Sequence, residues 1–147
     1  ILRNIPNKKV DVHNPDYLLH IEIRKDYTYI YHKEIKYSFK ESIDKLNRYI
    51  QNNKDYAISF IQKEIKDVYV VPTEATYLLW IDCHKVCLDS VELTSFIRKK
   101  TGLYVSDGLE YGENGKAFIR MNVACPFERL KDGLNRFKEG IYLYQNK

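Results

Sequence analysis

The most informative segment of this chain is Phe118-Ile119-Arg120-Met121-Asn122-Val123-Ala124-Cys125-Pro126. Successive side chains of a β-strand point to opposite faces of its sheet. Residues 117–125 therefore predict a strand whose apolar face consists of Ala117, Ile119, Met121, Val123 and Cys125. Pro126 predicts the start of a helix, because the first helical turn leaves N–H groups unpaired and proline has none to lose.

The opposite face of this strand carries Arg120, between Phe118 and Asn122. A desolvated guanidinium without an anionic partner is costly, and its planar fork is the best side-chain match to a carboxylate. One hypothesis is therefore that Arg120 clamps the carboxylate of a substrate. An internal salt bridge and a solvated strand face are the alternatives, and the residues alone leave all three open.

The region before this strand alternates between helical and extended spacing. Ser38 and Glu41 form a capping-box pattern, and apolar residues then recur at helical spacing to about Ile65, with a continuation or a kink after Asn52-Asn53. Strands are predicted at 67–71 and 76–82. Trp80 has apolar neighbours in the second of these strands, so we expect it to lie in the core.

Another helix is predicted from Asp89, which repeats the capping pattern with Glu92, to about Lys100. Gly102 is its expected C-terminal cap. A short strand at 103–106 and a glycine-bearing loop at 107–115 follow, and the loop is interpreted as a structural turn. A final helix after Pro126 has one apolar stripe, made of Phe127, Leu130, Leu134, Phe137, Ile141 and Tyr144.

This order of elements predicts an α+β fold, with a helix-flanked and mainly antiparallel sheet that forms an α/β sandwich. Ahead of it, residues 17–32 alternate in polarity and predict an appended β-hairpin. The expected domains are residues 1–36 and residues 37–147. With 44% apolar residues the chain can bury a core, so disorder is not expected.

Charge and cysteine content exclude several classes of function. The net charge is +4, and residues 1–36 carry seven Lys or Arg against five Asp or Glu, which is too little for a basic nucleic-acid-binding arm. The three cysteines, Cys83, Cys87 and Cys125, predict free thiols and a cytoplasmic protein. Cys83-His84-Lys85-Val86-Cys87 lacks the second ligand pair of a zinc site, so no metal is expected. No apolar run approaches the ~20 residues that span a bilayer.

Residues from about Tyr37 to the C-terminus resemble the small C-terminal domain of pyridoxal-phosphate-dependent carbon–sulfur lyases of the cystathionine β-lyase type, a branch of the aspartate-aminotransferase superfamily. The resemblance rests on four stretches of sequence: Glu74 through Asp82, Gly108 through Gly115, Phe118 through Pro126, and Leu130 through Arg136. Ala75 departs from the family, which usually has glycine there.

This resemblance implies that Arg120 grips the α-carboxylate of the substrate. It also implies that the groups holding the cofactor, including the Schiff-base lysine, belong to a large domain whose motifs do not occur here. We therefore expect a truncated small domain that has no catalytic residue, binds no pyridoxal phosphate by itself and is inactive alone.

Residues 8–35 resemble part of a THUMP domain, the RNA-binding module of 4-thiouridine tRNA sulfurtransferases. The matching motifs are Val10-Asp11-Val12, Asn14-Pro15-Asp16, Ile21-Glu22-Ile23-Arg24 and Tyr29-Ile30-Tyr31. The resemblance implies RNA contacts by Lys8, Lys9, Arg24 and Lys25. The junction near Lys36-Tyr37 looks like a fusion or deletion scar, and a natural two-part protein is the alternative.

Three functions are compatible with these observations. The chain is an inactive remnant of a pyridoxal-phosphate enzyme, an RNA-binding protein acting through residues 1–36, or an interaction module. In the last case an exposed strand edge, or the face that a large domain would cover, pairs two copies into a homodimer.

Overall fold

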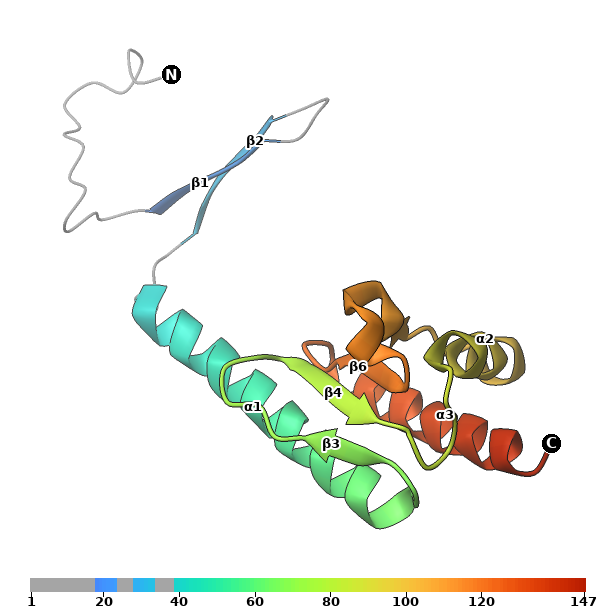
Figure 1. Cartoon of the computed structure of the whole chain (residues 1–147). Coiled ribbons are helices and arrows are strands. Elements are labelled where there is room, and N and C mark those ends of the chain that lie inside the picture. The colour runs from blue at the N-terminus through green and yellow to red at the C-terminus, as the bar shows by residue number, and fades with distance from the viewer. Residues whose placement is uncertain (1–17, 24–27, 34–38) are drawn as a thin grey trace, which may run out of the picture. The chain divides into compact units, whose positions relative to one another are not determined.

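The computed structural model describes residues 18–23, 28–33 and 39–147 (Figure 1). Its contacts divide the chain into two units, Ile1–Asp44 and Lys45–Lys147. In the first unit, β1 (Leu18–Ile23) pairs antiparallel with β2 (Thr28–Lys33), which confirms the predicted hairpin. The predicted junction near Lys36-Tyr37 lies outside the described residues.

The second unit contains a four-stranded antiparallel sheet. In the order β3-β4-β6-β5, the strands are Tyr69–Val71, Leu78–Asp82, Phe118–Asn122 and Ser106–Asp107. Antiparallel registers join every neighbouring pair, including Trp80 opposite Arg120 and Ser106 opposite Arg120. This confirms the predicted antiparallel α+β architecture.

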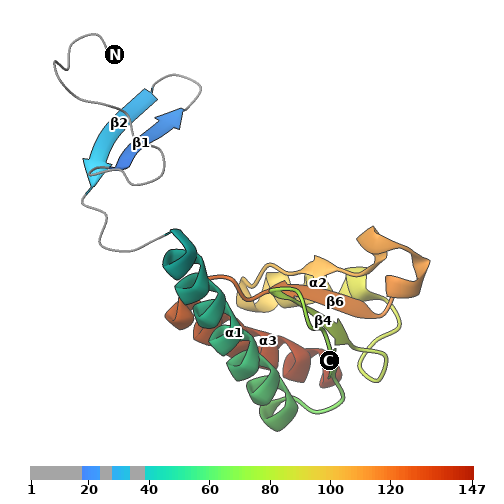
Figure 2. The ribbon, with the colours of Figure 1, turned by 90° about the vertical axis from the view of Figure 1, so that its left-hand side faces the viewer.

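Three helices accompany the sheet: α1 (Phe39–Glu64), α2 (Ser90–Thr101) and α3 (Phe127–Gln145). Figure 2 shows α1 and α3 running along the same side of β4 and β6. None of the helices in the described ranges is long and apolar enough to cross a membrane.

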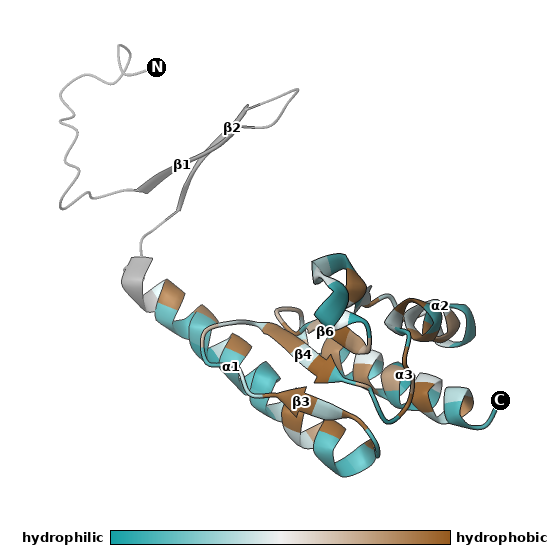
Figure 3. Ribbon diagram, in the orientation of Figure 1, coloured by the Kyte–Doolittle hydropathy of each residue, from teal (hydrophilic) through white to brown (hydrophobic). Residues whose placement is uncertain are grey.

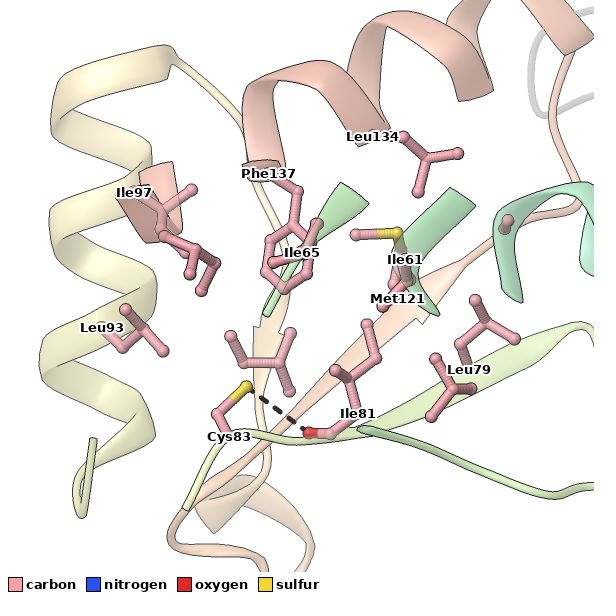
Figure 4. Close-up of a cluster of buried hydrophobic side chains, with 14 of the residues drawn as sticks. Ile61, Ile65, Leu79, Ile81, Cys83, Leu93, Ile97, Met121, Leu134 and Phe137 are labelled. Atoms are coloured by element: carbon pink, nitrogen blue, oxygen red, sulfur yellow. Dashed lines mark hydrogen bonds between the residues drawn. The ribbon is translucent and has the colours of Figure 1, made fainter. Parts of the chain in front are cut away.

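The core lies between the helices and one face of the sheet. Figure 4 shows side chains from both layers converging there: Leu79 and Ile81 of β4 and Met121 of β6 meet Ile61 of α1, Ile65 directly after it, Leu93 and Ile97 of α2, and Leu134 and Phe137 of α3. Ile119 and Val123 are also fully buried. β6 is shorter than the strand predicted over residues 117–125, but the predicted alternation is correct from Ala117 to Val123, and its apolar face packs on the helices.

The ends of α2 follow the predicted capping. Asp89 accepts hydrogen bonds from the backbone N–H groups of Val91 and Glu92, at 2.9 and 3.3 Å, and Gly102 closes the helix in the left-handed conformation with φ of 75°. Such an N-cap is worth about 1 kcal/mol.

α1 is one continuous helix through Asn52-Asn53, and its apolar stripe is buried over only part of its length. Ala57 and Ile61 are fully buried, whereas Leu46 is 56% exposed. Apolar and polar residues alternate along the coloured part of this helix in Figure 3. The first half of the helix thus presents apolar side chains that the described part of the chain does not cover.

The expectation that Trp80 lies in the core is wrong. Its neighbours Leu79 and Ile81 point toward the helices and are fully buried, so strand alternation turns Trp80 to the opposite face, where it is half-buried. The continuous apolar run Leu78–Ile81 hides this alternation in the sequence. Trp80 instead belongs to the open face of the sheet, which also carries Arg120.

Candidate carboxylate-binding site

Arg120 lies at the middle of β6, on the open face of the sheet. It is half-buried between Trp80 on β4 and Ser106 on β5, its register partners. Its backbone is fixed by hydrogen bonding to both neighbouring strands, so the side chain projects from a rigid part of the fold. Sites built on strands hold their geometry better than sites on loops.

The guanidinium of Arg120 has two neighbours. Its central carbon lies 4.4 Å from the ring centroid of Tyr111, a cation–π contact. Its Nη2 atom is 3.5 Å from the Ser106 hydroxyl oxygen, at the limit of a hydrogen bond. No carboxylate of the described residues comes within salt-bridge distance of Arg120. The guanidinium therefore keeps most of its donors available for an anion.

Tyr111 belongs to a cluster of aromatic rings on this face of the sheet. Trp80 stacks on Phe118 with centroids 5.3 Å apart and ring planes 14° apart, and it meets the edge of Tyr111 at 5.8 Å. Arg120 is half-buried on this aromatic face, and partial burial strengthens the attraction between its guanidinium and a carboxylate.

The glycine-bearing loop forms two 3-10 turns, Leu109–Tyr111 and Glu113–Gly115, which confirms the prediction of a structural turn. A Cβ on Gly108 would lie 2.3 Å from the Gly115 carbonyl oxygen, so the backbones approach too closely for a side chain. This packing places Tyr111 against Arg120. The sequence analysis did not predict a role for Tyr111. The available signal was its position as an aromatic residue within the glycine-rich turn that precedes β6.

The far end of β6 is anchored by α1. The side-chain amide of Asn53, which is 1% exposed, donates hydrogen bonds to the backbone carbonyls of Val123 and Cys125, at 2.9 and 2.8 Å. Beside it the ammonium of Lys54, 4% exposed, donates to the Thr73 carbonyl in the loop that leads to β4. The burial of these two residues was not predicted from the sequence, because polar residues in a helix are usually on its exposed surface.

The cysteines form no reactive or metal-binding group within the described ranges. Cys83 and Cys87 are buried free thiols, Cys125 is partly buried, and burial raises the pKa of all three. His84 bonds to the Asp82 carboxylate at 2.6 Å. No cluster of His, Cys, Asp or Glu in this part of the chain could hold a metal ion.

The candidate RNA-binding residues Lys8, Lys9, Arg24 and Lys25 lie outside the described residues, so the structure places none of them.

A groove of about 490 Å³ opens beside Arg120. Its lining residues are Leu78, Leu103, Tyr104, Val105, Ser106, Arg120, Met121, Asn122, Ala124, Cys125, Arg129, Leu130 and Gly133. The lining includes no lysine and no acidic side chain. The groove therefore fits an anion but does not fit pyridoxal phosphate, because it offers no amine for the aldehyde and no carboxylate for the pyridine nitrogen.

The architecture and the site together define a class: the small domain of the aminotransferase fold. Among solved structures, the pyridoxal-phosphate-bound C–S lyase from Staphylococcus hominis, complexed with L-cycloserine, is 30% identical with a TM-score of 0.61, over 67% of this chain and 24% of that chain. Cystalysin from Treponema denticola has the same fold, with a TM-score of 0.64 over 69% of this chain and 27% of that chain.

Curated proteins with similar sequences narrow this class to individual relatives. Cystathionine beta-lyase PatB of Bacillus subtilis is 33% identical over 99 residues, which is 67% of this chain and 26% of PatB. The THUMP domain family matches residues 1–33, and the "Probable tRNA sulfurtransferase" of Acetivibrio thermocellus is 53% identical over 36 residues, 24% of this chain and 9% of that protein. Both predicted resemblances are thus confirmed. The chain spans about a quarter of the length of PatB and of MalY from Escherichia coli.

Proposed function

We propose that residues 45–147 are the substrate-carboxylate-binding part of a pyridoxal-phosphate-dependent C–S lyase or aminotransferase, and that the chain alone does not catalyse the reaction. The observation that carries this proposal is Arg120, which is held in the middle of a strand, half-buried, in contact with the Tyr111 ring and without a carboxylate partner among the described residues. The similarity of the chain to PatB and the S. hominis lyase supports this class of protein.

In this proposal each described group has a limited task. Arg120 binds and orients the α-carboxylate, Tyr111 holds the guanidinium, and Trp80 supports the Tyr111 ring through an edge contact. When bound, the cofactor of the relatives supplies the electron sink, but no residue of this groove would anchor it.

The test is a titration of the full chain with S-methyl-L-cysteine, followed by backbone amide chemical shifts. Saturable shifts should centre on β5 and β6 and should disappear in Arg120→Gln. Arg48→Gln is the matched control, because Arg48 is an exposed arginine of α1 that does not line this groove. Equal affinity in wild type and Arg120→Gln would refute the proposal.

The absence of cofactor binding is tested separately. The chain is incubated with pyridoxal phosphate, reduced with borohydride and analysed by peptide mass spectrometry. We expect only scattered, substoichiometric labelling of surface lysines. Stoichiometric labelling of one lysine, together with turnover of L-cystathionine, would contradict the inactivity.

RNA binding is a second candidate, favoured by the THUMP match to residues 1–33. Its test is tRNA binding at low salt by the full chain and by Lys8→Ala/Lys9→Ala. The control is Lys99→Ala/Lys100→Ala, which removes the same charge from α2. Binding that weakens only in the first variant, with a steep dependence on salt, would support this function. No binding at low salt would exclude it.

A further inference from the structure

A groove of about 500 Å³ lies between the C-terminal ends of α1 and α3. Its floor is apolar and includes Ile65, directly after α1, and Ile141 of α3, which are 5% and 1% exposed. Tyr142 also lines the groove and is 64% exposed, and an exposed tyrosine beside an apolar hollow is a typical anchor of a protein interface. This interhelical groove shares no lining residue with the groove beside Arg120.

Two contacts hold the walls of the interhelical groove together. The ammonium of Lys138 on α3 lies 2.7 Å from the carboxylate of Glu64, the last residue of α1. The side-chain amide of Gln145 donates a hydrogen bond of 3.2 Å to the carboxylate of Asp67, which follows α1. The groove is therefore formed before anything binds, and a preformed surface loses less conformational entropy on binding than a flexible one.

The charged residues of the interhelical groove are two lysines and two glutamates. Glu64 and Lys138 neutralise each other, which leaves Lys66 beside the end of α1 and Glu139 on α3. No ion pair with any residue that the structure describes involves Lys66 or Glu139. The groove thus combines one cation and one anion, each without an ion-pair partner in the described ranges, with an apolar floor.

This charge pattern restricts what can cover the groove. An anionic ligand or a nucleic acid would be attracted by Lys66 and repelled by Glu139. A second copy of the same surface carries the opposite charge for each of them and a tyrosine for the floor. In a two-fold contact, a residue that meets another across the interface is met by it in turn, so a pair between Lys66 and Glu139 forms twice.

We infer that the interhelical groove is the contact surface of a homodimer. Lys66 of each copy pairs with Glu139 of the other, and Tyr142 of each copy packs on the apolar floor of the other. This surface differs from the strand edge and from the face that a large domain would cover. A groove of this size covers less than a standard protein interface, so the dimer should be weak and should depend on concentration.

The experiment is sedimentation velocity of the full chain from about 10 µM to about 1 mM, a range that suits a weak dimer. Lys66→Glu and Glu139→Lys each place like charges opposite one another at both contacts, so each should weaken the dimer about tenfold. The double variant Lys66→Glu/Glu139→Lys exchanges the charges and should dimerise as tightly as wild type. The two single variants change the net charge in opposite directions, so net charge cannot explain a loss in both.

A mixture of the two single variants tests the two-fold contact directly. In a mixed dimer, the glutamate at position 66 of one copy meets the lysine at position 139 of the other, and Glu139 of the first meets Lys66 of the second. Both contacts then join opposite charges. An equimolar mixture of Lys66→Glu and Glu139→Lys should therefore dimerise as tightly as wild type, although neither variant does so alone.

Two controls separate this surface from others. Lys99→Glu reverses an exposed charge of α2 outside the groove, and Leu46→Glu places a charge on the exposed apolar part of α1. Neither should change the dissociation constant of the dimer. All four substituted positions are exposed, so the fold should survive, which circular dichroism checks.

Several results would overturn the inference. One is a monomer throughout the concentration range, and another is a dimer that neither single charge reversal weakens. Failure of the double variant or of the mixture to restore the dimer would show that Lys66 and Glu139 do not meet across a two-fold contact. Loss of the dimer in Leu46→Glu alone would assign it to α1. None of these outcomes bears on the carboxylate binding proposed for Arg120.

Discussion

Gly140→Ala should destabilise the second unit, because Gly140 is the position where α3 packs against α2. A methyl group on Gly140 would lie 2.8 Å from Cγ1 and 3.0 Å from Cγ2 of Ile97, which is fully buried. Unstrained carbon atoms are about 3.5–4.0 Å apart, so either helix must shift. Such overpacking costs about 1–3 kcal/mol.

The higher helix propensity of alanine offsets part of this cost in the free energy of unfolding. Alanine in a helix interior is favoured over glycine by about 1 kcal/mol. The net expectation for Gly140→Ala is a loss of about 1 kcal/mol in the free energy of unfolding. Gly133→Ala, in the same helix, isolates the favourable part, because its methyl would lie 3.7 Å from Leu103 Cδ1, an ordinary contact. This control should gain about 0.5–1 kcal/mol.

The assay is urea unfolding followed by the fluorescence of Trp80, the only tryptophan of the chain, which lies in the unit that contains both glycines. The two variants should differ by about 2 kcal/mol. In an Ile97→Ala background the clash is mostly removed, so Gly140→Ala should no longer lower the free energy of unfolding. Equal stability of Gly140→Ala and Gly133→Ala would refute the packing described for α2 and α3.

Three further predictions concern the anchoring of β6, the buried thiol and the ring beside Arg120. Asn53→Ala leaves the carbonyls of Val123 and Cys125 without their partner and should lower the free energy of unfolding in urea by about 2–3 kcal/mol. Asn52 is exposed, so Asn52→Ala should change this free energy by less than about 0.5 kcal/mol. Equal losses in the two variants would contradict the anchoring of β6 by Asn53. Burial raises the pKa of Cys83 above its ordinary value of 9.0, so only the unfolded thiol ionises as the pH rises past about 9. The free energy of unfolding should then fall by about 1.4 kcal/mol per pH unit for this thiol, and an unchanged slope in Cys83→Ala would be inconsistent with its burial. Tyr111→Phe should keep the affinity for a carboxylate, measured by titration with butyrate. Tyr111→Leu should weaken this affinity about threefold, because it removes the cation–π contact with Arg120. Equal effects of the two variants would argue against that contact.

The order of elements could be predicted because each change of hydrophobic period marks a new element. The alternation in residues 117–125 also fixed which face of β6 packs on the helices, and Asp89 and Gly102 fixed the ends of α2. These are local signals. They depend on neighbouring residues in the chain and not on what lies opposite them.

The parts that could not be predicted depend on distant partners. Asn53 and Lys54 are polar residues in a helix, and only the carbonyls that face them in the fold explain their burial. Trp80 was misplaced because an unbroken apolar run gives no sign of which residues point inward.

The most direct measurement of the central claim observes the Arg120 side chain itself. The Nε–H resonance of Arg120, assigned by its loss in Arg120→Gln, is followed while S-methyl-L-cysteine is added to the full chain. We predict a saturable shift that is absent when the methyl ester of the same amino acid is used, because the ester has no carboxylate. An equal shift with the ester, or no shift with the acid, would contradict the assignment of Arg120 as the carboxylate-binding residue.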